Sequence, residues 1–139
     1  VEQVHRLAGP SVRLLGQIND QKHVKELYCN AYAYIHGHQF GGTNPALLRA
    51  LGYGNCVLAL DTPFSREVLD GVGGGEARYG ILFAKNPADL AAKIRFVVDH
   101  PKVQADYAHR APNRIRECYT WEHITDGYER LCRRMVEGG

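Results

Sequence analysis

Two short apolar runs limit most strongly what this chain can fold into. Cys56–Leu60 has the sequence CVLAL, and Tyr79–Phe83 has the sequence YGILF. Nearly unbroken apolar runs that are separated by helical patterns are typical of parallel strands covered by helices on both faces. The two runs therefore predict a doubly wound, Rossmann-like α/β fold.

Further strands and helices are predicted around these runs. Val12–Leu15 (VRLL) and Ala31–Ile35 (AYAYI) are expected to be strands. Helices are expected at about residues 20–30, 45–51, 63–69, 86–99, 102–119 and 121–136. The expected N-cap residues are Asp20, Asn44, Asn86 and Thr120, and Pro45 and Pro87 stand at first helical positions. A glycine-rich turn is expected at Gly71–Gly75, and a single domain over residues 1–139 is the simplest division.

The start of the chain has the pattern of a helix end. Val1–Ala8 is helical in pattern, and Gly9 and Pro10 follow as a C-terminal stop. The sequence also lacks an initiator Met. We therefore expect the chain to begin inside a larger protein, so that the first strands of the domain lie upstream.

Composition argues against several classes of protein. The formal net charge is +2, which is too close to neutral to favour nucleic acid or an anionic membrane as partner. No apolar stretch is long enough for a transmembrane segment, and no signal-peptide pattern opens the chain. The four cysteines form no CxxC pair and are interpreted as reduced, core or half-buried thiols, with a disulfide or a metal site as the alternative. These observations favour a cytoplasmic protein.

One loop has the chemistry to bind a phosphorylated ligand. It follows the second predicted strand and reads HGHQFGGTN over residues 36–44, directly before Pro45. Ligands of open parallel sheets bind beyond the carboxyl ends of the strands, where this loop should lie. Gly41 and Gly42 would let the backbone approach a phosphate, and the next helix would offer unpaired N–H groups and the positive end of its dipole.

Polar residues of this loop each allow more than one interpretation. Thr43 and Asn44 either cap the helix or donate to a ligand, since a Gly-Gly-Thr-Asn-Pro run is also an ordinary loop-to-helix connection. His38 is expected to hydrogen-bond a phosphate or a sugar hydroxyl, or else to make a structural hydrogen bond. His36 and His38 lack the further ligands that a metal site needs, so neither a metal nor another cofactor is expected.

The third strand should end at the same edge of the sheet, in Asp61-Thr62-Pro63. Arg66 and Glu67 follow on a short helix. Glu67 is a candidate for contact with the ligand, or it complements the helix dipole. Arg66 is interpreted as a solvated side chain, which is the default for a lone arginine.

Several segments of the chain occur in the same order in one enzyme family. They read HGH at 36–38, GGTNPALLRALGYG at 41–54, VLALD at 57–61, REV at 66–68 and YTWE at 119–122. In these segments the chain resembles retaining glycosyltransferases of family 4, which have the GT-B fold, and most closely their bacterial rhamnosyltransferase-like branch. The resemblance extends from Val12 to about Leu131 and implies a partial GT-B C-terminal domain.

The resemblance implies that the chain binds a nucleoside-diphosphate sugar, the donor of the transferred sugar. The residues expected at the donor are His38, Gly41, Gly42, Thr43, Asn44, Arg49 and Glu67. The loop residues would lie by the phosphates and the sugar, and the helix that carries Arg49 would approach the ribose. Arg49 and Gly41 depart from the family, which commonly has glutamate at both positions, and arginine cannot accept a hydrogen bond from ribose.

We therefore expect the donor-binding part of a hexosyltransferase that acts on a saccharide or a lipid-linked acceptor. We expect residues 1–139 to lack the acceptor-binding N-terminal domain and to be inactive on their own. The chain should work with that domain, with another subunit or as a homo-oligomer. No residue is assigned as catalytic acid or base. The alternatives are a non-catalytic binding or assembly module that kept the fold and a sugar-nucleotide epimerase of related fold.

Overall fold

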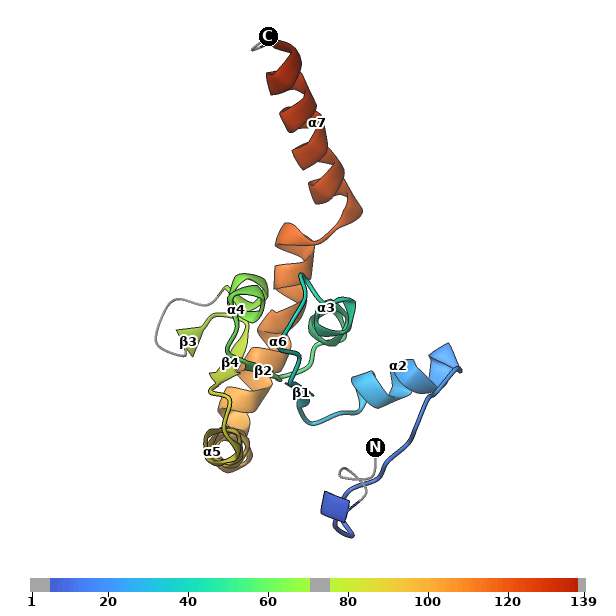
Figure 1. Ribbon diagram of the computed structural model, residues 1–139, viewed down its shortest axis with the longest axis vertical. Coiled ribbons are helices and arrows are strands. Elements are labelled where there is room, and N and C mark those ends of the chain that lie inside the picture. The colour runs from blue at the N-terminus through green and yellow to red at the C-terminus, as the bar shows by residue number, and fades with distance from the viewer. Residues whose placement is uncertain (1–5, 71–75, 138–139) are drawn as a thin grey trace.

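A four-stranded sheet lies at the centre of the molecule, as the computed structural model of residues 6–70 and 76–137 shows (Figure 1). The strands are β1 (Tyr34–His36), β2 (Val57–Leu60), β3 (Glu76–Ala77) and β4 (Gly80–Phe83), in the spatial order β1-β2-β4-β3. The helices are α2 (Gln21–Cys29), α3 (Pro45–Gly52), α4 (Pro63–Leu69), α5 (Pro87–Asp99), α6 (Pro101–Cys118) and α7 (Trp121–Glu137).

Parallel pairing joins the strands that helices connect. Strand β1 pairs in parallel with β2, and β2 pairs in parallel with β4. Each parallel connection passes through at least one helix, as parallel strands require. The expected α/β fold is therefore confirmed. Strand β3 was not expected, and it runs antiparallel to β4 as a two-residue edge.

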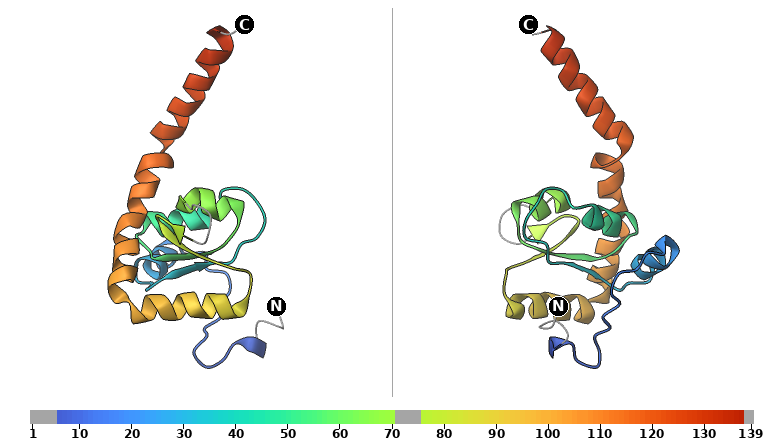
Figure 2. Two further views of the ribbon diagram at one scale, coloured as in Figure 1. Left: turned by 90° about the vertical axis from the view of Figure 1, so that its left-hand side faces the viewer. Right: turned by 45° about the vertical axis from the view of Figure 1, so that its right-hand side comes forward.

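Helices cover both faces of this sheet (Figure 2). One core cluster lies under α3, α4 and the second half of α6, and it includes Leu51, Leu69 and Leu82. The other lies under α5 and includes Leu58, Phe83 and Val97. All residues of β2 and β4 are buried, because both strands have neighbours on each side and helices above and below. This two-sided burial explains why their sequences are apolar without alternation.

The predicted helix starts are present in the structure. Asp20 Oδ1 accepts a hydrogen bond from the Lys22 amide at 2.9 Å, and Asn86 Oδ1 accepts one from the Asp89 amide at 2.7 Å. Thr120 Oγ1 accepts one from the His123 amide at 3.1 Å. The caps therefore place α2, α5 and α7 close to where the sequence predicts them.

The prediction of a strand at Val12–Leu15 is wrong. The segment is extended without a ladder, and Val12, Leu14 and Leu15 are 54%, 42% and 55% exposed. An extended segment becomes a strand only when a neighbour accepts its hydrogen bonds, and β1 pairs with β2 alone within the described residues. Residues 1–5 of the expected N-terminal helix and the expected turn at Gly71–Gly75 lie outside the described residues, while residues 6–7 are helical.

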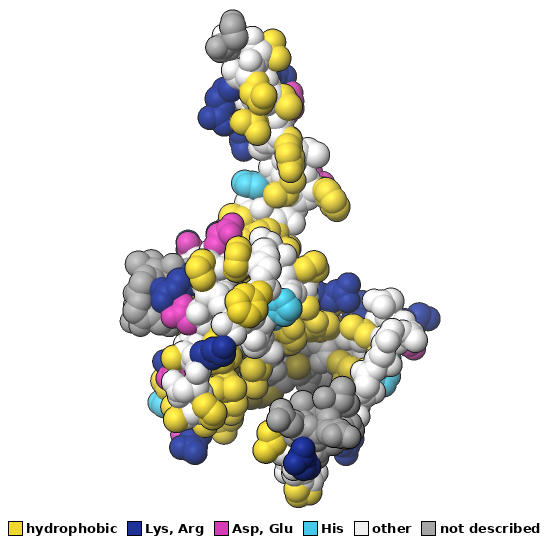
Figure 3. Space-filling model, in the orientation of Figure 1, with side chains coloured by type: hydrophobic (Ala, Val, Ile, Leu, Met, Phe, Trp, Pro, Cys, Tyr) yellow, Lys and Arg dark blue, Asp and Glu magenta, His cyan; other side chains and the backbone are white. Residues whose placement is uncertain are grey.

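Helix α7 projects away from the rest of the molecule (Figure 1). Its apolar side chains lie on one side of the helix, where Trp121, Tyr128 and Met135 are 83%, 67% and 72% exposed (Figure 3). Among the described helices, none is long and apolar enough to cross a membrane.

All four cysteines are free thiols, but they do not share one environment. Cys56 is buried, and burial raises the pKa of its thiol to about 11, which makes it unreactive. Cys118 is half-buried, whereas Cys29 and Cys132 are exposed. The expectation of core or half-buried thiols is therefore wrong for the two exposed cysteines, because α2 and α7 bury no residue.

Candidate functional site

Three connections meet at one edge of the sheet. The carboxyl ends of β1, β2 and β4 lead into the starts of α3, α4 and α5. Helix α6 lies across the opposite ends of the strands, where Gln104 Nε2 donates to the carbonyl of Tyr32, just before β1, at 2.6 Å. The edge where parallel sheets bind ligands is thus free of α6.

A small cleft lies at this edge, between the loop after β1 and the start of α4. Its lining residues are His36, His38, Gln39, Phe40, Gly41, Gly42, Asn44, Leu47, Thr62, Phe64, Ser65 and Val68. The enclosed part measures about 10 Å³, room for about one water molecule. A ligand larger than a water molecule would therefore lie over the mouth of the cleft, against the exposed loop.

The start of α3 does not offer the free amides that the sequence suggested. Asn44 Oδ1 accepts from the Ala46 amide at 2.9 Å, and Asn44 O accepts from Leu47 at 3.0 Å and from Leu48 at 3.2 Å. Pro45 has no amide hydrogen. Expecting unpaired N–H groups in the first turn of this helix was therefore wrong for Ala46 and Leu47, and Asn44 acts as the cap.

The loop itself keeps unpaired donors. The amides of Gly41, Gly42 and Thr43 donate to no acceptor within the described part of the chain. Gly41 has φ of +109°, a backbone conformation that residues with a Cβ rarely adopt. The glycine thus turns the backbone so that consecutive amides stay available to an anion.

Two stacked histidines stand beside these amides. The rings of His36 and His38 have centroids 5.9 Å apart. His36 is buried, and burial lowers its pKa, with a further lowering by the charge of His38, so the ring is neutral at pH 7. A Cβ on Gly41 would lie 3.9 Å from His38 Nε2. His38 therefore presents a ring nitrogen to the glycine turn.

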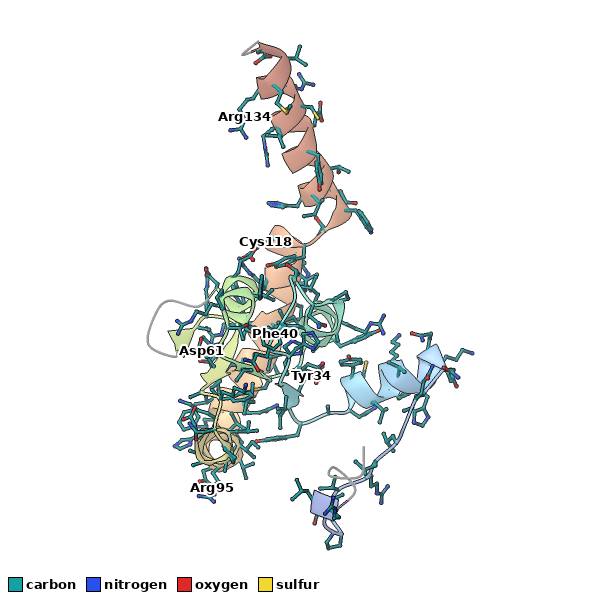
Figure 4. All side chains as sticks on the ribbon, viewed as in Figure 1. Tyr34, Phe40, Asp61, Arg95, Cys118 and Arg134 are labelled. Carbon is teal, nitrogen blue, oxygen red and sulfur yellow. The ribbon has the colours of Figure 1, made fainter. Side chains whose placement is uncertain are left out.

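An ion pair and a hydroxyl pair follow β2, and the ion pair includes Asp61, which Figure 4 labels. Arg66 Nη2 donates to Asp61 Oδ2 at 2.6 Å, and Arg66 Nε lies 2.6 Å from Asp61 Oδ1. Interpreting Arg66 as a solvated side chain was therefore wrong. Thr62 Oγ1 donates to Ser65 Oγ at 3.1 Å in the buried wall of the cleft. Because Arg66 neutralises Asp61, the edge does not repel an anionic ligand.

Lys85 is a residue that the sequence reasoning missed. It lies two residues after the end of β4, and its Nζ donates to Gln39 Oε1 on the glycine loop at 2.6 Å. The contact places an exposed cation next to Gln39 of the glycine loop. Its signal in the sequence was its position, two residues after an apolar strand and directly before the Asn86-Pro87 helix start.

Comparisons with known proteins agree with this geometry. A family profile described as glycosyl transferase-like matches residues 1–130 of the chain. The chain belongs to this family. A search of curated sequences finds no match.

One crystal structure, of the GtfA/B complex, resembles this glycosyl transferase-like chain with a TM-score of 0.71 at 15% identity. The match covers 96% of this chain and 27% of the other chain, so the chain spans about a quarter of the length of the protein that it matches. At this identity, the likeness establishes the fold alone. It agrees with the partial GT-B domain that the sequence predicted.

The glycosyl transferase-like fold does not bring every expected donor residue to the cleft. His38, Gly41, Gly42 and Asn44 line it. The remaining expected residues are Thr43, Arg49 and Glu67, and none of them lines the cleft. Donor contact by all seven residues therefore remains a prediction from the sequence.

Each of the three outlying residues has a different position. Thr43 borders an apolar groove shared with Trp121 at the start of α7. Arg49 borders a groove between α2 and α3. Glu67 is exposed on α4, where its backbone carbonyl accepts from Arg114 Nη2 at 2.6 Å. Burial raises the pKa of Tyr119 at the end of α6, and the charge of Glu67 adds to this rise. No cluster of His, Cys, Asp and Glu among the described residues could hold a metal ion.

Proposed function

We propose that the chain is the donor-binding part of a glycosyltransferase, which moves a hexose from a nucleoside-diphosphate sugar to a saccharide or lipid-linked acceptor. The observation that carries the proposal is the glycine turn at the sheet edge, where the amides of Gly41, Gly42 and Thr43 have no acceptor among the described residues. His38 and Lys85 stand beside the same turn. The four free thiols fit a reducing compartment such as the cytoplasm.

The turn would act on the leaving group of the reaction. When the sugar departs, negative charge grows on the diphosphate and must be stabilised by donors that are already in place. Loop amides and the ammonium of Lys85 supply such donors without a large rearrangement. We assign no catalytic acid or base to this chain.

A nucleoside-diphosphate titration tests this proposal. We expect uridine, guanosine or thymidine diphosphate, at about 100 times its dissociation constant, to add about 2.7 kcal/mol to the free energy of unfolding. This corresponds to a rise in melting temperature of roughly 5 °C or more. Differential scanning fluorimetry measures the rise, and amide NMR shifts at residues 41–44 locate the ligand.

The nucleosides without phosphate are the matched control, and they should leave the melting temperature unchanged. If no nucleoside diphosphate raised it, the donor-binding proposal would be wrong. That result would favour the alternative of a non-catalytic assembly module, which the arginine at position 49 in place of the family's glutamate also supports.

We place the contact with the acceptor-binding part, in the same polypeptide or in another subunit, on α7. Its apolar side is exposed, and its first turn shares an apolar groove with Thr43 on the glycine loop. The groove measures about 280 Å³, and its walls include Leu48, Tyr119 and Ile124. A partner seated on α7 would therefore lie next to the proposed donor site, where the acceptor must arrive.

Hydrogen exchange tests the partner surface. Without a partner, α7 is a helix of 17 residues with little tertiary support, and such helices are marginal in water. We expect its amides in the isolated chain to exchange at least about 100-fold faster than those of β2. Light scattering on the same sample would report self-association. Protection of α7 equal to that of β2 in a monomeric chain would contradict the assignment.

A further inference from the structure

A second groove lies away from the cleft, between α2 and the end of α3. It measures about 340 Å³, within the range of small-molecule sites. Its lining residues are Gln21, Lys22, Val24, Lys25, Arg49 and Tyr53. The groove is thus bordered by basic side chains from two helices that are distant in sequence.

These basic side chains have no acidic partner within the described residues. Neither Lys22, Lys25 nor Arg49 takes part in an ion pair there. The acids of α2 and its cap are engaged elsewhere, since Asp20 caps the helix and Glu26 Oε2 accepts from Asn30 Nδ2 at 3.2 Å. Figure 3 shows basic side chains on the α2 side of the molecule. The groove therefore concentrates positive charge in a chain whose net charge is only +2.

One wall of the groove is held in place. Tyr53 stacks on Tyr28 with ring centroids 5.6 Å apart, and Tyr28 lies 5.5 Å from Tyr34 of β1. The stack ties α2 and the end of α3 to the sheet. The stack therefore holds the two elements that carry the cations next to one another, which lowers the ordering cost of binding.

We propose that this groove binds a phosphate group, as a site separate from the glycine loop. The planar guanidinium of Arg49 can donate two parallel hydrogen bonds to phosphate oxygens, and the two ammonium groups add point charges. A phosphate fits better than a carboxylate, because its higher charge can balance cations that approach from both helices. The groove is open, so the group belongs either to a free phosphorylated molecule or to a lipid headgroup at a membrane surface.

Amide NMR with inorganic pyrophosphate tests the site at low ionic strength. We expect shifts at residues 21–25 and 49–53, and a loss of affinity of about tenfold in the triple variant Lys22→Gln/Lys25→Gln/Arg49→Gln. The matched control, Arg130→Gln/Arg133→Gln/Arg134→Gln, removes the same charge from α7 and should keep the shifts. Amide shifts at residues 41–44 report binding at the glycine loop separately. The experiment can therefore contradict either site without contradicting the other.

Vesicle sedimentation separates the two sources of phosphate. A lipid headgroup would be assigned if the wild type pelleted with phosphatidylglycerol vesicles but not with phosphatidylcholine vesicles. The triple variant should then pellet with neither. Pyrophosphate binding without pelleting would assign it to a free molecule. Unmoved amides at 21–25 and 49–53, or equal shifts in the triple variant, would overturn the site.

Discussion

Replacing Gly41 by valine is expected to weaken the binding of nucleoside diphosphates by roughly 30-fold or more, with little loss of stability. Gly41 has φ of +109°, which a β-branched residue adopts only at a cost of about 1–3 kcal/mol. The new side chain would also approach His38 Nε2, which lies 3.9 Å from the Cβ position. The loop would relax, and its amides would turn away from the phosphates. Isothermal titration calorimetry measures the affinity, and urea unfolding measures the stability.

Gly37→Val is the matched control on the same loop. Gly37 has no positive φ, and a Cβ there would meet no atom within 4 Å. Valine is therefore compatible with its backbone, and we expect the affinity to change less than about twofold. Equal losses in the two variants would mean that the loop tolerates no side chain anywhere. Unchanged affinity in both would remove the loop from the donor site.

The order of the elements could be predicted from the sequence because local signals agreed with tertiary burial. The apolar strands β2 and β4 are buried on both faces, and their runs contain no polar residue. Asn44 and Asn86 are caps that need only two or three neighbouring residues to form. Such short-range chemistry is visible in a linear sequence.

Local sequence signals did not predict which segments pair as strands. Val12–Leu15 has the composition of a strand, but a strand also needs a neighbour, which the sequence does not reveal. Strand β3 is too short for any periodicity, and it exists because a two-residue turn at Arg78 and Tyr79 brings it beside β4. Long-range partners decided both cases.

The part of the candidate site that depends on neighbouring residues was predictable from the sequence, and the part that depends on long-range contacts was not. Gly41 and Gly42 are recognisable because glycines lack a Cβ and mark a loop whose backbone a ligand can approach closely. Lys85 joins the site through a hydrogen bond to Gln39, and these residues are 46 positions apart. Arg49 borders the groove beside α2 and does not line the cleft. Neither contact has a signature in the linear sequence.

Gly80→Ala is expected to lower the free energy of unfolding by about 3 kcal/mol. A Cβ on Gly80 would lie 2.9 Å from the carbonyl oxygen of Val57 and 2.9 Å from Leu69 Cδ1. The leucine side chain can move, but the carbonyl belongs to β2, which is held between β1 and β4. The methyl group must therefore push two central strands apart. Urea unfolding followed by circular dichroism measures the change.

The cause of this loss can be separated from the general effect of adding a methyl group. Gly52→Ala, at the end of α3, places its Cβ 4.0 Å from Ile115 Cγ1, which is an ordinary contact, and should raise the free energy of unfolding by roughly 0.5 kcal/mol. The double variant Gly80→Ala/Leu69→Ala relieves the side-chain overlap but not the overlap with the carbonyl. We expect it to be less stable than Gly80→Ala alone, because it adds a cavity. Recovery of stability in the double variant would show instead that Leu69, and not the neighbouring strand, sets the requirement for glycine at this position.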